Sequence, residues 1–220
     1  MALAYYNGDG IDKAAAVAWY RKAAEQGDGD AQYSLGRVYS NGDGVPVDKA
    51  AAVAWYRKAA EQGHKCAQNV MGTAYQFGFG VPVDKAAAVV WYRKAADQGD
   101  SDAQFYLAVA YGSGDGEPVD KAASAAWYRK AADQGHSDAQ YCLALAYRTG
   151  DGVPKNKATS VAWLHKAAEQ GHADAQYELG LSYRNGDGVT VDEAAGFEWN
   201  RRAAEQGHER ALRMPLSLTS

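Results

Sequence analysis

The sequence predicts an all-α solenoid of about six 36-residue helix-turn-helix units, and two observations lead to this fold class. The six tryptophans recur at a constant interval of 36 residues, as Trp19, Trp55, Trp91, Trp127, Trp163 and Trp199. The segments around them are copies of one another, since residues 13–27 and 49–63 are the same fifteen-residue string. A constant period of this size is typical of a stacked array of repeats rather than of several independent domains.

Apolar spacing predicts two helices in each unit. In the unit 28–63, one set of apolar residues recurs every three or four positions from about residue 28 to residue 41, and a second set does so from about 48 to 62. The first set is Ala31, Leu35, Val38 and Tyr39, and the second is Ala52, Trp55, Tyr56, Ala59 and Ala60. No segment shows the strict alternation of a strand. The unit therefore reads as a helical hairpin.

The residues between the two helices predict where each helix ends and begins. Gly42 and Gly44 are expected to stop the first helix, because glycine reaches the left-handed conformation at little cost. Pro46 prevents that helix from resuming, and Asp48 is a favourable N-cap for the second. Because both glycines recur in all six loops, we expect their role to be geometric.

The charge pattern argues against a polyanionic partner. The formal net charge is −4, so no overall positive field attracts nucleic acid or an acidic membrane surface. Basic residues also alternate with acidic residues four positions away, as Arg57 does with Glu61, which is typical of a solvated helix face. No segment approaches the roughly 18 apolar residues of a membrane span. We expect a soluble chain with no nucleic-acid partner and no membrane insertion.

The two cysteines, Cys66 and Cys142, are expected to be free thiols. They lie two repeats apart, which is roughly 20 Å if each helical layer adds about 10 Å. A disulfide tolerates a Cα separation of only about 7 Å.

Packing between layers is predicted from small and aromatic residues. Gly36 and Gly72 would let a neighbouring helix approach closely, while tryptophan and tyrosine fill the space between layers. Because all six tryptophans share one register, we expect them to be core residues. Truncation of Trp91 to alanine is then expected to cost about 3 to 5 kcal/mol.

The sequence predicts no catalytic residue, no cofactor and no metal site. Four histidines share one register in the turn between units, where we expect turn or cap residues; they are His64, His136, His172 and His208. Neighbouring ones would be about 10 Å apart, whereas two ligands of one zinc ion each lie about 2.1 Å from it. The glycine-rich loops lack the oxygen ligands of a calcium loop and the glycine spacing of a dinucleotide loop. No nucleophile, base and orienting acid are grouped within one unit.

The string "AQYSLGRVYSNGDGVPVDKAAAVAWYRKAAEQG" resembles the Sel-one-like repeat (SLR) family, which is related to the tetratricopeptide repeat (TPR). The resemblance rests on L-G-x-x-Y in the first helix, G-x-G-V in the loop and D-x-x-x-A-x-x-W-Y-x-K-A-A-E-x-G in the second helix. It covers essentially residues 1 to 207. It implies an SLR/TPR-like solenoid that forms a right-handed α-α superhelix, with the first helices lining a concave groove.

One solenoid domain is predicted over residues 1–207. Its units are 1–27, 28–63, 64–99, 100–135, 136–171 and 172–207, followed by a partial helix cap and tail at 208–220. The first helix of the first unit is represented only by residues 1–7, so the chain reads as a fragment, and we expect fraying or self-association at that truncated repeat. At the other end Glu209, Arg210 and Arg213 begin a polar cap that Pro215 ends.

The resemblance implies a non-catalytic scaffold or adaptor that binds a protein or peptide in the concave groove. The candidate partner-binding residues are Arg37, Ser40, Asn69, Thr73, Gln76, Phe77, Phe79, Phe105, Tyr141, Arg148, Tyr177 and Arg184. Two alternatives stay open. The chain is a β-lactam-binding or β-lactam-hydrolysing enzyme like the cysteine-rich branch of the family, or it is a module of a larger protein whose activity lies elsewhere. The compartment is open between the bacterial cytoplasm and periplasm.

One loop departs from the others. The stretch "QFGFGVPVDK" at 76–85 carries Phe77 and Phe79 where "SNGDGVPVDK" at 40–49 has Asn41 and Asp43. The glycines are kept, so the turn is expected to be the same. Two exposed aromatic rings beside a groove are a candidate anchor for a partner, and drift or packing against a neighbouring loop is the alternative.

Overall fold

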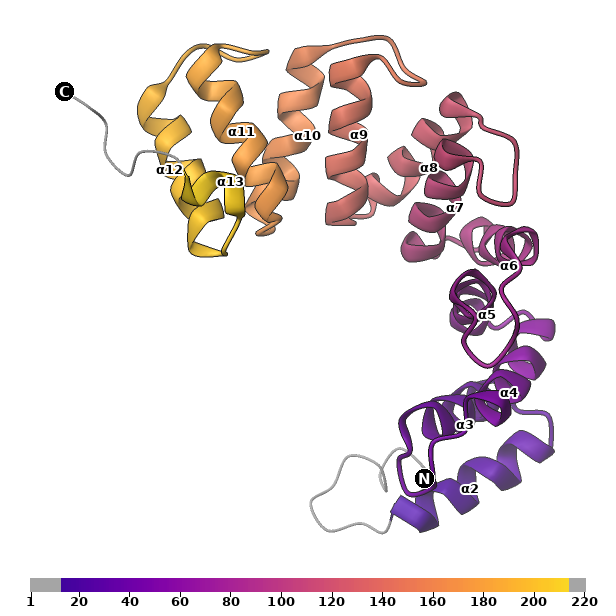
Figure 1. The fold of residues 1–220 in the computed structure, drawn as a ribbon. Helices are drawn as coiled ribbons and strands as arrows, with labels where there is room; N and C mark the ends of the chain where they lie inside the picture. The colour runs from indigo at the N-terminus through magenta and orange to yellow at the C-terminus, as the bar shows by residue number, and fades with distance from the viewer. Residues whose placement is uncertain (1–12, 214–220) are drawn as a thin grey trace. The chain divides into compact units, whose positions relative to one another are not determined.

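The computed structural model describes residues 13–213, which form helices throughout and contain no strand. Twelve helices follow one another in this range (Figure 1), and successive helices lie side by side from α2 to α6 and from α8 to α13. They are α2 Lys13–Glu25, α3 Gly29–Asn41, α4 Lys49–Glu61, α5 Lys65–Phe77, α6 Lys85–Asp97, α7 Ser101–Ser113, α8 Lys121–Asp133, α9 Ser137–Thr149, α10 Lys157–Glu169, α11 Ala173–Asn185, α12 Glu193–Glu205 and α13 Glu209–Leu212. The predicted all-helical solenoid, with two helices per repeat, is confirmed.

The predicted helix ends are confirmed by their caps. The Asp48 carboxylate accepts a hydrogen bond from the backbone N–H of Ala51 at 2.9 Å and so begins α4. Gly42 ends α3 in the left-handed conformation, with φ of 78°, and its N–H donates to the carbonyl of Val38. Both are local arrangements that satisfy helix-terminal groups, which is why sequence alone predicts them.

The second loop glycine has a further role, which is contact with the preceding repeat. A β-carbon added at Gly80 would stand 2.4 Å from the carbonyl oxygen of Lys49, the first residue of α4. The loop after each first helix therefore lies directly on the start of the preceding second helix. Only glycine combines this approach with φ of 71°.

The tryptophans are less buried than predicted. Trp163 is 5% exposed, but Trp19 is 45% exposed and the other four are only partly buried. The neighbouring position fills the core instead, where Tyr56 and Tyr92 lie against the first helices. Adjacent helix residues point about 100° apart, so the tyrosine faces the core at Tyr56 and Tyr92 while the neighbouring tryptophan lies at its edge. At Trp163 and Leu164 both residues are buried. The expectation that all six are core residues is wrong, and because Trp91 is only partly buried its truncation to alanine should cost less than about 3 kcal/mol.

The chain divides into two compact units, residues 1–107 with 115–118 and residues 108–114 with 119–220, and each feature described below lies within one of them. In the described range, no helix is both long and apolar enough to cross a membrane. The predicted first helix at residues 1–7, the self-association of that repeat and the role of Pro215 lie outside the described residues. The cap at the other end forms the short helix α13, which includes Glu209 and Arg210.

Candidate functional site

The predicted partner-binding residues differ in how much surface they offer. The exposed ones are Arg37, Phe77, Phe79 and Arg184, and the partly buried ones are Ser40, Asn69, Thr73, Gln76, Phe105, Tyr141, Arg148 and Tyr177. Several of the partly buried side chains are engaged within the repeat array.

Tyr141 and Tyr177 each stack on a histidine that caps a helix. The Nδ1 atom of His172 accepts a hydrogen bond from the N–H of Ala175 at 3.2 Å and thereby begins α11. Its Nε2 lies 3.2 Å from a carboxylate oxygen of Asp138 in the preceding repeat, and its ring lies 4.7 Å from that of Tyr141. The expectation that these histidines are turn or cap residues is confirmed, and the two tyrosines complete the caps.

Two further side chains fill space between helices. The hydroxyl of Tyr92 donates to the side-chain oxygen of Gln76 at 2.7 Å, and Tyr106 stacks on the same ring with centroids 5.1 Å apart. Two repeats later in register, Arg148 forms an ion pair with Glu178. In both repeats, large side chains from two neighbouring first helices fill the space between those helices and the second helix that connects them. These side chains are Gln76 and Tyr106 in one repeat and Arg148 and Glu178 in the other.

In the two other equivalent places that space is open, and each forms a pocket. The first pocket, of about 440 Å³, is lined by Ser40, Lys49, Ala52, Val53, Tyr56, Val70, Thr73, Ala74 and Phe79. The second pocket, of about 460 Å³, is lined by Val109, Gly112, Ser113, Lys121, Ser124, Ala125, Tyr128, Cys142, Leu145, Ala146, Thr149 and Asp151. Lys49 and Lys121, Tyr56 and Tyr128 are pairs in the same register, 72 residues or two repeats apart. The pockets are thus the same feature of the repeat, opened in alternate units.

Side-chain size at two registers explains the alternation. One register reads Ser40, Gln76, Gly112 and Arg148, and the other reads Val70, Tyr106, Cys142 and Glu178. Both positions are small in the open repeats and large in the filled ones. The pockets therefore exist where both facing first helices carry small side chains in the same repeat. These pockets were not predicted from the sequence, although the alignment of the two registers shows the pattern of small and large residues.

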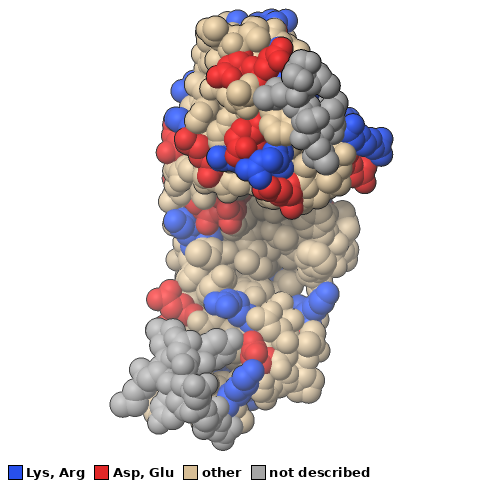
Figure 2. Space-filling view, turned by 90° about the vertical axis from the view of Figure 1, so that its left-hand side faces the viewer, with Lys and Arg blue, Asp and Glu red and all other residues tan. Residues whose placement is uncertain are grey.

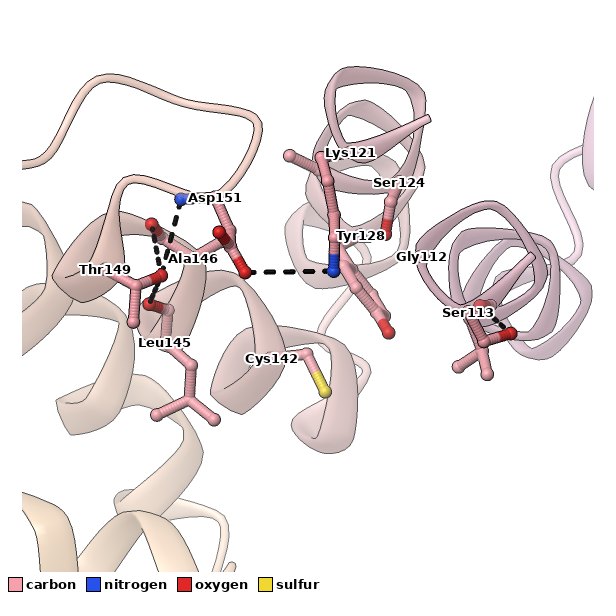
Figure 3. Close-up of a pocket in the computed structure, with 12 residues that line it drawn as sticks. Gly112, Ser113, Lys121, Ser124, Tyr128, Cys142, Leu145, Ala146, Thr149 and Asp151 are labelled. Atoms are coloured by element: carbon pink, nitrogen blue, oxygen red, sulfur yellow. Dashed lines mark hydrogen bonds and ion pairs between the residues drawn. The ribbon is translucent and has the colours of Figure 1, made fainter. Parts of the chain in front are cut away.

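The second pocket holds no activated nucleophile. Burial raises the pKa of the Cys142 thiol, which is hydrogen-bonded to Tyr128, and burial raises the pKa of Tyr128 as well. The Ser124 hydroxyl donates to the carbonyl of Ala108 at 2.7 Å. Figure 3 shows the ion pair between Lys121 and Asp151, in which the lysine Nζ lies 3.8 Å from the aspartate Oδ2. A protonated thiol and a hydroxyl committed to the backbone do not form the machinery of nucleophilic catalysis.

The first pocket differs in its charge. In four other repeats, the lysine that starts the second helix pairs with the loop aspartate thirty residues later. These pairs are Lys13 with Asp43 at 3.2 Å, Lys85 with Asp115 at 2.7 Å, Lys121 with Asp151 at 3.8 Å and Lys157 with Asp187 at 2.6 Å. At the first pocket Phe79 replaces the aspartate. The ammonium of Lys49 lies 5.2 Å from the centre of the Phe79 ring, and no ion pair joins it to a carboxylate in the described part of the chain.

A third pocket, of about 410 Å³, lies beside the His208 cap and is lined by Tyr141, Asp174, Tyr177, Glu178, His208, Glu209 and Arg210. On the face shown in Figure 2, lysine and arginine are interspersed with aspartate and glutamate over the residues that are not grey. Within residues 13–213, no group of three or more His, Cys, Asp or Glu side chains is arranged to hold a metal ion. The first and second pockets and the aromatic pair Phe77 and Phe79 are the candidate contact features of the first helices and their loops.

Comparison with known proteins identifies the repeat. The family model described as Sel1 repeat matches residues 1–28, 29–64, 67–100, 101–136, 137–172 and 173–208. No curated protein matches the chain.

Solved structures agree with this assignment. A protective antigen present in uropathogenic Escherichia coli strains, which displays an SLR fold, is 42% identical with a TM-score of 0.92; the match covers 96% of this chain and 45% of that one, so this chain spans less than half of its length. A Sel1 repeat protein from Oxalobacter formigenes is 30% identical with a TM-score of 0.80, over 92% of this chain and 86% of that one. An immunity protein from Pseudomonas aeruginosa, 23% identical with a TM-score of 0.53 over 97% and 82%, shows the fold alone. The chain therefore belongs to the Sel1 repeat family.

Proposed function

We propose that this chain is a non-catalytic scaffold or adaptor that binds a protein or peptide across its first helices and the loops that follow them. Sel1 repeats are generally protein-interaction modules, and Sel1 scaffold proteins are generally non-catalytic. The observation that carries the proposal for this chain is the pair Phe77 and Phe79, which are 53% and 47% exposed with ring centroids 5.8 Å apart. Exposed aromatic side chains beside a pocket are typical anchors of an interface.

The two rings are not needed for the turn that carries them. Gly78 and Gly80 have φ values of 76° and 71°, close to the 78° of both Gly42 and Gly44 in the preceding loop, where the neighbouring residues are Asn41 and Asp43. The same backbone therefore forms with either pair of side chains. The two aromatic rings expose apolar surface to water, which is unfavourable, and they are not needed for the conformation of the loop. We therefore assign them to partner binding.

The enzymatic alternative receives less support. It rests on a branch of the family with a cysteine pair in every repeat, whereas this chain has two cysteines, both free. A chromogenic β-lactam assay tests it directly, and reproducible turnover that is lost on Cys142→Ser would contradict the scaffold proposal. The second alternative concerns a longer parent protein, whose further domains would add contacts to those proposed for this chain.

Site-specific crosslinking tests the proposal. Benzoylphenylalanine is introduced at position 77 or, as the matched control, at position 41 in the preceding loop, and each protein is irradiated in an extract of the cells that produce it. We expect a discrete protein adduct at position 77 that is weak at position 41. The Phe77→Asn/Phe79→Asp variant, added in excess without the crosslinker, should compete less well than the parent chain. Equal adducts at both positions, or equal competition, would contradict a role for the aromatic pair.

A further inference from the structure

We infer that the first pocket binds an apolar side chain of a partner protein segment that carries an aspartate or glutamate directly beside it, with Lys49 contacting the carboxylate. This inference rests on the proposed function and names the ligand chemistry of one of its sites. Three observations carry it: the exchange of an aspartate for Phe79, the apolar lining of the pocket, and the intact ion pair in the second pocket.

The first observation concerns a carboxylate that the repeat normally supplies. In four other repeats, a loop aspartate neutralises the lysine at the start of the second helix. Phe79 removes that carboxylate and leaves the exposed ammonium of Lys49 with only the face of a ring at 5.2 Å. A carboxylate from a partner would restore the interaction that the other repeats make internally, which is an argument from charge complementarity.

The second observation concerns the floor of the pocket. Ala52, Val53 and Tyr56 are 2%, 6% and 6% exposed, so this surface is held in place by the packed second helix. The hydroxyl of Tyr56 is hydrogen-bonded to Ser40, which leaves the ring edge and the aliphatic groups of Val53 and Val70 to line the space. Its volume of about 440 Å³ lies within the range of about 300 to 1,000 Å³ that is common for ligand pockets.

The third observation is the second pocket, which has the same arrangement of helices but a lysine that already has a carboxylate partner. There Lys121 already has the carboxylate of Asp151 at 3.8 Å (Figure 3). An incoming carboxylate would have to compete with Asp151 and would be repelled by it. The first pocket can therefore accept an acidic ligand, whereas the second pocket should not accept one and serves as an internal control.

Phe79 also adds to the first pocket directly. Its ring is one of the lining side chains, and it extends the apolar surface toward Phe77. The combination of an apolar pocket, an aromatic rim and an unpaired cation matches a short segment with alternating acidic and apolar residues. We therefore commit to a protein segment of that composition as the occupant.

The experiment uses the four phenylalanines of the chain as reporters. The full-length protein is labelled with 4-fluorophenylalanine, so that Phe79 reports on the pocket and Phe197 serves as a remote reference. The probes are acetyl-Glu-Leu-Glu-amide and its uncharged match acetyl-Gln-Leu-Gln-amide, titrated to millimolar concentrations at low ionic strength. We expect the glutamate peptide to shift the ¹⁹F resonance of Phe79 and not that of Phe197, with an affinity about 2- to 5-fold higher than that of the glutamine peptide.

Two matched variants assign the effect. Lys49→Gln should abolish the preference for the glutamate peptide, whereas Lys121→Gln, the same change in the second pocket, should preserve it. The inference is wrong if neither peptide shifts the Phe79 resonance, if both bind equally to the parent, or if Lys121→Gln removes the preference. Hexanoate, which has an alkyl chain and a carboxylate but no peptide, must bind more weakly; equal binding would mean that the occupant is a free carboxylic acid and not a protein segment.

The result of the peptide titration can be separated from the result of the crosslinking experiment that tests the proposed function. The crosslinking experiment at position 77 reports whether any protein binds beside the aromatic pair, without regard to the charge of the ligand. A positive crosslink with no peptide preference would overturn the ligand chemistry inferred here and leave the scaffold proposal standing. Loss of the position-77 crosslink would count against the proposed function itself.

Discussion

The ring of Tyr92 lies so close to Gly72 that a β-carbon added to the glycine would stand 2.5 Å from Cδ1 of the ring. The same relationship joins Tyr56 to Gly36, where the distance would be 2.6 Å. In each case the second helix of a repeat packs its tyrosine directly on the backbone of the first helix. The glycine in the middle of the first helix is therefore required for packing, although it weakens the helix itself.

Replacement of Gly72 with alanine is expected to destabilise the protein by about 1 to 3 kcal/mol, because the buried Tyr92 ring has to move. This cost exceeds the gain in helix propensity, which is at most about 1 kcal/mol. Urea unfolding followed by circular dichroism measures the change. The matched control is Gly29→Ala, since no atom lies within 4 Å of a β-carbon at Gly29 and alanine occupies its register at Ala173. A neutral Gly72→Ala variant would contradict the close packing.

Replacement of Asn200 with leucine is expected to stabilise the protein by about 1 to 3 kcal/mol. Asn200 is 5% exposed, and neither of its side-chain polar atoms has a hydrogen-bond partner within the described residues. Leucine already fills this register at Leu164, one repeat earlier, where alanine (Ala144) stands in the register of Gly180. The thermal midpoint should rise, while Asn185→Leu, on the exposed end of α11, should leave it unchanged. A lower midpoint for Asn200→Leu would contradict this expectation.

Stability is expected to fall as the pH rises above 10. Burial raises the pKa of Tyr56 to about 12 and also raises that of Tyr92, whereas a tyrosine in the unfolded chain loses its proton near pH 10. The folded state holds these protons more tightly, so the stabilisation is complete below pH 10 and is lost progressively up to about pH 12. Urea unfolding at intervals from pH 9 to 12 checks this. Tyr56→Phe should reduce the slope over that interval, and an unchanged slope would contradict the assignment.

The two thiols are expected to react at clearly different rates. Cys66 is exposed, whereas Cys142 is partly buried in the second pocket, where burial raises the pKa of its thiol. Because the thiolate is the reactive form, Cys142 should react more slowly with Ellman's reagent at pH 8. The single variants Cys66→Ser and Cys142→Ser assign the two phases. Equal rates would mean that the second pocket opens freely to the reagent.

The double substitution Phe77→Asn/Phe79→Asp is expected to leave helicity unchanged and stability within about 0.5 kcal/mol. The new aspartate would give Lys49 the partner that its counterparts have, and the loop glycines keep their conformation. Circular dichroism and thermal melting test this outcome. A large loss of stability would show that the two rings support the fold, and would remove the reason for assigning them to a partner.

Much of the fold was predictable because it depends on local chemistry. The first residues of α3 and α4 follow from their caps at Asp28 and Asp48, and their ends follow from glycine and from apolar spacing. The histidine register was also predictable as a capping position. Its second contact, between His172 and Asp138, was not, because those residues come from different repeats and the spacing of 34 carries no local signal.

The tryptophans show where such reasoning fails. Trp91 and Tyr92 are adjacent, apolar and repeated in register, so periodicity alone assigns both to the core. In the structure Tyr92 is 1% exposed, while Trp91 is only partly buried and lies beneath the ammonium of Lys94 at 4.3 Å. Which of the two faces inward depends on the helix in the next layer, and therefore on packing.

The repeat, its two helices and their caps follow from the amino-acid sequence, because each depends on residues a few positions apart. Which repeats contain an open pocket and which lysine lacks a carboxylate depends on the packed layers. Those features depend on side chains from three helices and a loop, such as Val70, Thr73 and Phe79 around Lys49. A pocket is a property of the space that neighbouring layers leave unfilled, and that space exists only once the layers are stacked.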